Sequence, residues 1–222
     1  MIVAIDGPSG AGKSTLAKRL ARELGFIYLD TGAMYRALAL QVLRRGVDLA
    51  DDGAMTQLVA DSSIDLAERD GRLEVYLDGE EVSGLIRTPE VSQMASKASA
   101  LKIVRQRMLE LQRALGMRGN VVAEGRDVGT VVFPEAEVKI FLDASLRERA
   151  RRRFEELQKA GRSVSFSDTL AEMEERDRRD TERDIAPLRR ADDALAIDSS
   201  SLDADSVARQ VVAAIQHKAL AN

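Results

Sequence analysis

Residues 7–15 read GPSGAGKST and follow an apolar run, MIVAI, and Asp6. The stretch fits the pattern Gly-x-x-x-x-Gly-Lys-Ser, in which glycines bring the backbone close to phosphate oxygens and turn its N–H groups inward. A helix that begins at Lys13 adds the positive end of its dipole. We therefore predict a nucleoside triphosphate site, with the Lys13 ammonium on the β- and γ-phosphates and the Ser14 hydroxyl on magnesium. Its residues are Gly7, Pro8, Ser9, Gly10, Ala11, Gly12, Lys13, Ser14 and Thr15.

The elements around this stretch predict an α/β fold. Residues 2–5 form an apolar strand, residues 13–24 have helical periodicity, and Gly25 is placed to end the helix. A second strand (residues 26–29) and a second helix (residues 34–43) follow. A strand, a phosphate turn, a helix and a strand in this order open a doubly wound parallel sheet. Further strands of that sheet are expected at residues 120–125, 138–143 and 194–200.

The α/β pattern is interrupted by a segment of different character. A short capped helix is expected within residues 51–63, and an antiparallel meander follows at residues 64–83. Its alternating runs are separated by Asp-Gly at residues 70–71 and 78–79, a hairpin signal. Helices are expected again at residues 89–100 and 102–115, then two charged helices joined around residues 162–165, and a last helix at residues 203–217. The predicted organisation is one compact unit with two inserted segments, the meander region and the pair of charged helices.

Composition limits the possible functions. The chain has 222 residues, a formal net charge of −4, no cysteine and one histidine. Disulfides and thiolate chemistry are excluded, and a single histidine cannot build a metal cluster. The balanced charge does not suggest a nucleic-acid or polybasic membrane protein. No apolar run approaches a membrane span, so we expect a cytoplasmic protein with small-molecule substrates.

Three classes of nucleotide-binding protein are compatible with the phosphate loop. A GTPase switch usually carries Asn-Lys-x-Asp for guanine, which this chain lacks. A motor-type or transporter-type ATPase usually has a strand ending in aspartate before a long further domain, whereas residues 120–125 read NVVAEG and the chain is short. Of the three classes, the sequence therefore favours a small-molecule kinase. The acceptor site of such a kinase should be rich in arginine.

Arginines occur where such an acceptor site is expected. Arg36 lies one turn into the second helix, and Arg126 and Asp127 follow a predicted central strand. Ligands of open α/β sheets bind outside the carboxyl ends of the strands. The run RDRRDTERDIAP adds Arg176, Asp180 and Arg183. The planar fork of arginine suits phosphate because it makes two charge-assisted hydrogen bonds.

The motifs together resemble those of the bacterial cytidylate kinase family, nucleoside monophosphate kinases with a P-loop. The resemblance rests on IDGPSGAGKST, LDTGAMYR, GEEVSGLIRTPEVS, EGRDVGTVVFPEAEVKIFLDAS and ERDRRDTERDIAPL, and runs from residue 2 to about residue 200. It implies transfer of the γ-phosphoryl group of ATP to CMP or dCMP with Mg²⁺, by a monomer. It also implies a core of about residues 1–30, 100–144 and 181–222, an acceptor-binding region of about 31–99 and a lid of about 145–180. Another P-loop kinase, of the UMP or shikimate type, is the alternative.

The same resemblance implies individual roles in the acceptor site. Thr31 matches a hydroxyl near the acceptor, and Arg36, Arg126 and Arg183 match arginines around its phosphate. Ser96, Arg105 and Asp127 match cytosine contacts, while Arg176 and Asp180 match ribose contacts. Some members have aspartate at the position of Glu124 or Gly-Thr at that of Ser14-Thr15, which leaves the magnesium geometry open.

The expected mechanism needs positioning and charge stabilisation more than covalent chemistry. A phosphate oxygen is already a nucleophile, so no general base is required. Lys13, Arg126 and Arg183 are the candidate catalytic residues. Arg152 and Arg153, from RERARRR, are the candidate lid residues on ATP. A closing lid would exclude water as a competing acceptor.

Overall fold

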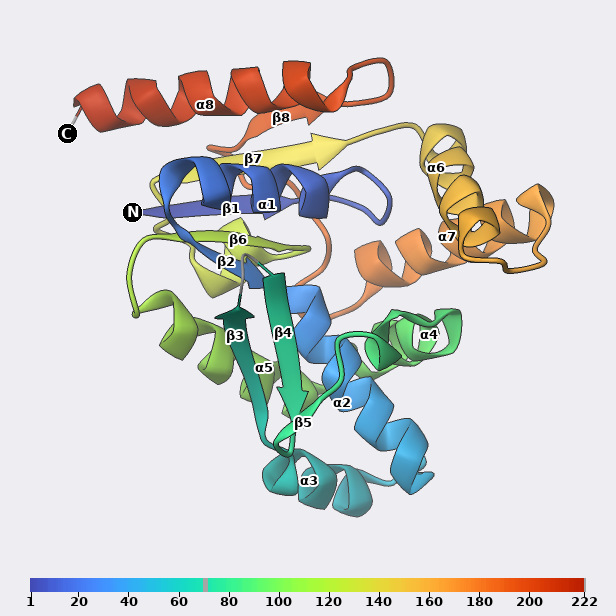
Figure 1. Cartoon of the computed structure of the whole chain (residues 1–222). Coiled ribbons are helices and arrows are strands. Elements are labelled where there is room, and N and C mark those ends of the chain that lie inside the picture. The colour runs from blue at the N-terminus through green and yellow to red at the C-terminus, as the bar shows by residue number, and fades with distance from the viewer. Residues whose placement is uncertain (70–71, 222) are drawn as a thin grey trace. The chain divides into compact units, whose positions relative to one another are not determined.

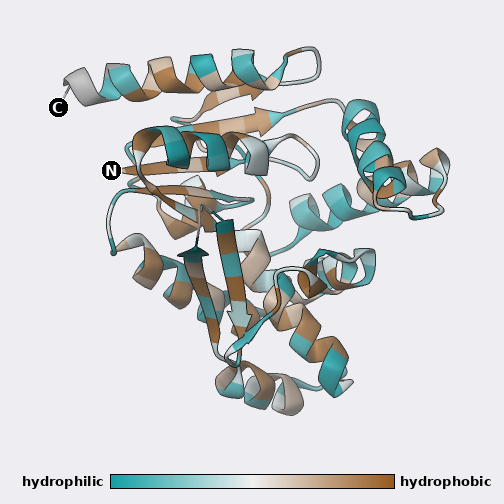
Figure 2. Cartoon of the chain, viewed as in Figure 1, coloured by the Kyte–Doolittle hydropathy of each residue, from teal (hydrophilic) through white to brown (hydrophobic). Residues whose placement is uncertain are grey.

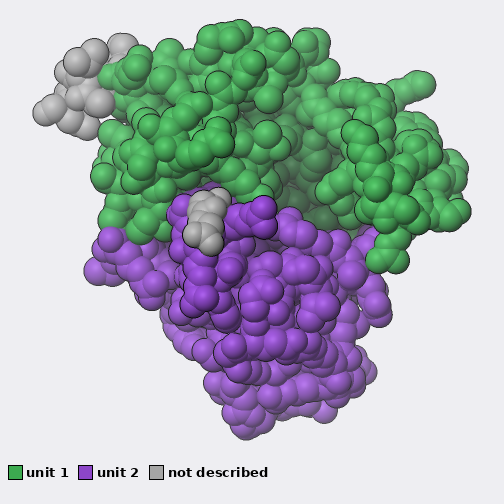
Figure 3. Space-filling view, in the orientation of Figure 1, with its two compact units in different colours: residues 1–27, 119–222 green, residues 28–118 purple. Residues whose placement is uncertain are grey.

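A computed structural model describes residues 1–69 and 72–221 and divides the chain into two compact units (Figures 1 and 3). Unit 1 comprises residues 1–27 and 119–222, and unit 2 comprises residues 28–118. The division assigns residues 102–116 to unit 2, although the sequence placed them with the core. The turn expected at residues 70–71 lies outside the described residues.

The principal sheet is parallel and has the order β2-β6-β1-β7-β8. Unit 1 holds four of its strands, and β2 (Ile27–Asp30) runs across the unit boundary. The register pairs Asp6 with both Gly125 and Phe141, so the central strands end at the same edge. The four strands are β1 (Ile2–Asp6), β6 (Val121–Gly125), β7 (Val138–Asp143) and β8 (Leu195–Asp198).

Helices pack against this sheet in unit 1. α1 (Lys13–Leu24) lies against β6 and beside α8 (Ala204–Ala221), which also contacts β7 (Figure 1). β1 and β6 are mainly apolar and almost wholly buried, whereas β8 has three of its four residues exposed. Figure 2 colours most of these strands brown, for hydrophobic residues. A five-residue π-helix, Val128–Val132, follows β6.

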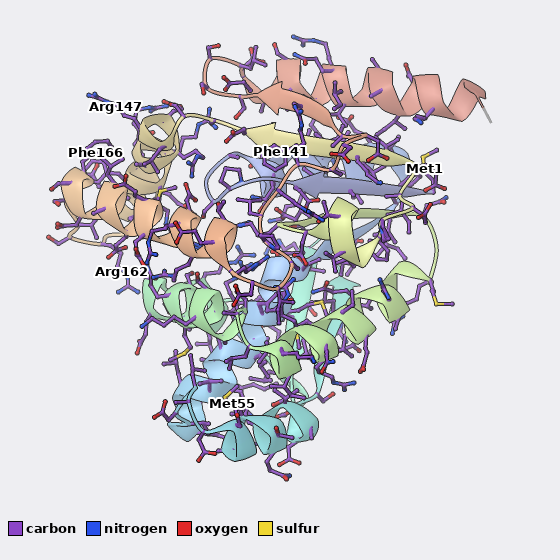
Figure 4. All side chains as sticks on the ribbon, turned by 180° about the vertical axis from the view of Figure 1, so that it is seen from behind. Met1, Met55, Phe141, Arg147, Arg162 and Phe166 are labelled. Carbon is purple, nitrogen blue, oxygen red and sulfur yellow. The ribbon has the colours of Figure 1, made fainter. Side chains whose placement is uncertain are left out.

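Two charged helices complete unit 1. α6 (Leu146–Lys159) and α7 (Phe166–Glu182) pack against each other, with Phe154 and Phe166 edge to face at 6.0 Å. Figure 4 labels Arg147 at the start of α6 and Arg162 in the connection between the helices. Outward-facing arginines on both helices pair with glutamates three or four residues away.

Unit 2 is an antiparallel sheet with helices. Its order is β3-β4-β5, and α2 packs against β3, β4 and α4. Its strands are β3 (Ile64–Arg69), β4 (Arg72–Leu77) and β5 (Glu80–Glu81). Its helices are α2 (Thr31–Arg45), α3 (Asp52–Asp61), the 3₁₀ turn Leu85–Arg87, α4 (Pro89–Ala98) and α5 (Lys102–Gly116).

The expected elements are present, with differences at their ends. α1 has the predicted bounds and ends at Gly25, whose φ is 67°. α2 begins at Thr31 instead of residue 34, because the Asp30 carboxylate accepts a hydrogen bond from the Ala33 N–H and caps the helix. The meander is confirmed, and its second turn has positive φ at Asp78 and Gly79, as a type I′ hairpin requires.

Candidate active site

The phosphate loop joins β1 to α1 and has the backbone of an anion site. Gly7, Gly10 and Gly12 have φ of 148°, 78° and 99°. A Cβ on Gly7 would lie 1.9 Å from the carbonyl oxygen of Leu142, so this position admits only glycine. α1 has no side-chain cap at its N-terminus. Its first N–H groups are therefore available to an anion.

Lys13 lies inside this loop with only 6% of its surface exposed. Its ammonium donates to the carbonyl oxygen of Pro8 at 2.7 Å. Burial and then the charge of Arg126 lower the pKa of Lys13 to about 7, against the opposing effects of Glu124 and Asp6. A buried cation surrounded by arginines is stabilised by a ligand of high negative charge.

The lowered pKa of Lys13 predicts that ATP binding weakens with pH. Above about pH 7 the free protein must take up a proton to present the Lys13 cation, so the affinity for ATP should fall by about tenfold per pH unit between about pH 8 and pH 9. The terminal phosphate of ATP is already ionised in that range. Calorimetric titration at several pH values measures the slope.

The matched control for this slope is Lys13→Arg. A guanidinium stays charged throughout the range, so its slope should be nearly flat. Equal slopes in the two proteins would contradict the assignment of the proton to Lys13.

Ser14 and Glu124 bring two oxygen groups together beside the loop. The Ser14 hydroxyl donates to Glu124 Oε2 at 3.0 Å, and Glu124 is buried at the end of β6. Mg²⁺ prefers hard oxygen ligands, keeps several waters and commonly binds through a few protein oxygens and phosphates. Among the described residues no group of three histidine, aspartate or glutamate side chains could hold a metal. The pair therefore fits a magnesium ion that arrives with a nucleotide.

A cavity of about 630 Å³ lies beside the phosphate loop in unit 1. The loop, α1, α6 and the segment after β8 line it. Gly12, Thr15, Arg152, Ser199, Ser200 and Leu202 are among its lining residues. Its mixed polar and apolar wall is typical of a small-molecule site. The sequence interpretation missed residues 199–204, and their position after a parallel strand was the signal that could have found them.

The lid candidates differ in where they lie. Arg152 lines the cavity and donates to the Ser199 carbonyl at 2.6 Å and to Glu148 at 2.9 Å. Arg153 pairs with Glu156 and does not line the cavity. Arg149, which the sequence did not single out, is buried and donates to the Ser9 carbonyl of the phosphate loop at 3.1 Å. Its partner on α7 is Asp177, at 2.6 Å.

A buried cluster of opposite charges stands next to the end of β6. Arg126 donates to Asp180 Oδ2 at 2.8 Å, and Arg183 lies 3.6 Å from Asp127 Oδ1. Burial opposes ionisation of Asp180, but Arg126 and Arg176 hold its pKa below the usual value. The structure thus brings together the five residues predicted from the segments at 126–127 and 176–183.

Unit 2 carries the other four predicted acceptor residues. Arg36 donates to the Asp30 carboxylate at 2.9 Å, and Thr31 is buried at the start of α2. Arg105 is buried, donates to the Ser99 carbonyl at 3.2 Å and has its guanidinium 5.7 Å from the centre of the Tyr35 ring. Ser96 is buried on α4. Tyr35 is a further aromatic side chain that the sequence reading did not propose.

Comparison with known proteins identifies the family. A sequence profile of the family described as cytidylate kinase matches residues 3–217. The chain belongs to the cytidylate kinase family. It is 52% identical to a cytidylate kinase of Pelotomaculum thermopropionicum over 96% of this chain and 95% of that protein. It is 49% identical to a cytidylate kinase of Syntrophotalea carbinolica over 98% and 93% of the two chains.

A solved structure supports the fold alone. An uncharacterised protein of Eubacterium ventriosum matches with a TM-score of 0.54, 13% identity and coverage of 97% and 98%. Among the described helices, none combines the length and apolar character that crossing a membrane would need.

Proposed function

We propose that the protein transfers the γ-phosphoryl group of ATP to CMP or dCMP, giving ADP and CDP or dCDP. It is an ATP-dependent phosphotransferase with a phosphate group as acceptor. Family membership over nearly the whole chain is the observation that carries this assignment. The phosphate loop and the buried Arg126 cluster give it a chemical basis in unit 1.

ATP is assigned to the phosphate loop and the adjoining cavity. The loop N–H groups and Lys13 hold the phosphates, and residues 199–204 with Arg152 face the adenosine. Arg149 is assigned to the phosphate end because it already contacts the carbonyl of Ser9. Arg153 stays a weaker candidate, since its guanidinium pairs with Glu156.

CMP is assigned to the acceptor residues that the family resemblance implies. Its phosphate is held by Arg36, Arg126 and Arg183, with Thr31 nearby. The cytosine is read by Ser96, Arg105 and Asp127, and the ribose by Arg176 and Asp180. Charge complementarity supports this, because a cluster of guanidiniums suits a phosphate. Residues 31–99 are proposed as the acceptor-binding region and residues 145–180 as the lid.

The transfer step is assigned to electrostatic stabilisation. Lys13, Arg126 and Arg183 offset the charge that spreads over the transferring group, and an oxygen of the CMP phosphate is the nucleophile. Ser14 and Glu124 would hold Mg²⁺. When bound, that ion neutralises charge on the ATP phosphates. We also propose that the protein is a monomer that acts in the cytoplasm, as the family resemblance suggests.

A panel of acceptors tests the function. With ATP and Mg²⁺, we expect ADP release with CMP and dCMP at least about tenfold faster than with UMP, because one misplaced hydrogen-bonding group costs about that much or more. A coupled assay for ADP measures the rates. Turnover of shikimate or gluconate with no nucleotide acceptor would contradict the assignment, as would ATP hydrolysis that no acceptor stimulates.

A further inference from the structure

Asp6 is a buried carboxylate that the assignments above leave without a role. It is the last residue of β1 and precedes the phosphate loop directly, with 5% of its surface exposed. Its Oδ1 accepts from the Val128 N–H at 2.8 Å and its Oδ2 from the Gly129 N–H at 2.7 Å. Each carboxylate oxygen thus accepts a hydrogen bond from the backbone that follows Asp127.

Burial of the Asp6 carboxylate is energetically unfavourable for its ionised form. Burial raises the pKa of Asp6 to about 6, and the charge of Asp127 acts in the same direction. The two N–H groups and Lys13 only partly offset this. Burying an ionisable group in this way costs folding free energy, which its two hydrogen bonds only partly offset.

The neighbours of Asp6 indicate what its carboxylate does. In the parallel register Asp6 pairs with Gly125, after which the chain leaves the sheet with Arg126 and Asp127. Asp127 has φ −143° and ψ 23°, outside regular helix and strand, and stands at the start of the π-helix. The Asp6 carboxylate therefore fixes an irregular segment of backbone next to Arg126 and Asp127, the two residues assigned above to the acceptor.

We propose that Asp6 is a positioning residue for nucleotide acceptor recognition. It holds the backbone after Asp127 against the strand that continues into the phosphate loop. Arg126 and Asp127 are thereby kept at a fixed place relative to Gly7 and Lys13. The proposal rests on the acceptor roles assigned above to Arg126 and Asp127.

The packing around Gly129 is consistent with this role. A Cβ on Gly129 would lie 3.3 Å from Asp6 Oδ2 and 3.3 Å from Lys139 Cδ. Gly129→Ala therefore places a methyl group tightly against Asp6 Oδ2 while the carboxylate remains. It serves as a second variant if a substitution at Asp6 prevents folding.

Asp6→Asn is the direct test, because the amide has nearly the same shape but only one accepting oxygen. One of the two N–H groups must then face an NH₂ group. We expect the KM for CMP to rise by about tenfold or more, since a buried donor loses its partner. The Kd for ATP should change by a smaller factor than the KM for CMP, because both hydrogen bonds of the Asp6 carboxylate are with residues 128 and 129, and the phosphate loop is affected only through the lost charge near Lys13. The backbone N–H groups of residues 128 and 129 should also exchange hydrogen faster by NMR.

Glu137→Gln is the matched control. Glu137 Oε2 accepts from the Ile2 N–H at 2.7 Å, at the opposite end of the same strand. Its substitution should leave the KM for CMP unchanged. Gly129→Ala should raise the KM for CMP in the same direction as Asp6→Asn.

The outcomes separate the proposal from the function on which it rests. Unchanged exchange at residues 128 and 129 in Asp6→Asn would overturn it. A fall in thermal stability with an unchanged KM for CMP would do so too, because that is the result of a purely structural role. Failure of the wild-type protein to use any nucleotide acceptor would instead reject the function, and the exchange measurement would still report on the Asp6 contacts.

Discussion

Lys13→Ala should lower kcat for phosphoryl transfer from ATP to CMP by about 10²–10³-fold, the usual effect of removing one preorganised electrostatic contact. The Lys13 ammonium is buried within the loop, and among the residues that the structure describes it donates a hydrogen bond only to the Pro8 carbonyl. Its charge is therefore available to the phosphates throughout the transfer. Steady-state rates at saturating substrates measure the loss.

The same substitution should leave thermal stability unchanged or raise it. The folded-state pKa of Lys13 lies below the ordinary value of 10.5, so at pH 7 the unfolded chain holds more protons and folding is penalised. Removing the amine removes that penalty. Lys18→Ala, on the exposed face of α1, is the matched control and should keep full activity. A Lys13→Ala protein with more than about half the wild-type rate would contradict the assignment.

Asp127→Ala should narrow the preference for CMP over UMP. Cytosine presents an amino donor at N4, for which a carboxylate is the natural partner, whereas uracil presents an acceptor there. Sites built around such hydrogen bonds discriminate by up to about 10⁴-fold. We expect kcat/KM for CMP to fall by at least about 10²-fold and kcat/KM for UMP to fall less. The measurement is kcat/KM for both acceptors at saturating ATP.

Asp127→Asn is the control for the ion pair with Arg183, which lies 3.6 Å away. The amide keeps the shape of the carboxylate and can donate to O4 of uracil, so it should narrow the ratio further than alanine. If CMP and UMP lose the same factor in both variants, Asp127 orients Arg183 and does not read the base.

Local sequence signals predicted most of the fold. The phosphate loop and α1 were predicted in full because glycines, a lysine and helical periodicity act over neighbouring residues. The hairpin at Asp78 and Gly79 was predicted for the same reason. The start of α2 was placed three residues late, because its first turn depends on one hydrogen bond that the Ala33 N–H donates to the side chain of Asp30.

The sequence by itself determined the chemistry at the phosphate loop and the family resemblance, since both are written in contiguous residues. Only the tertiary structure decided which distant charges meet. Arg126 pairs with Asp180 across 54 positions of sequence, and Asp6 reaches Val128 across 122. It also separated Arg149, buried on the loop, from Arg153, paired with Glu156, in one arginine-rich helix. Composition cannot distinguish these arginines, because helix rotation and the packing of α6 on α7 set which ones face the loop.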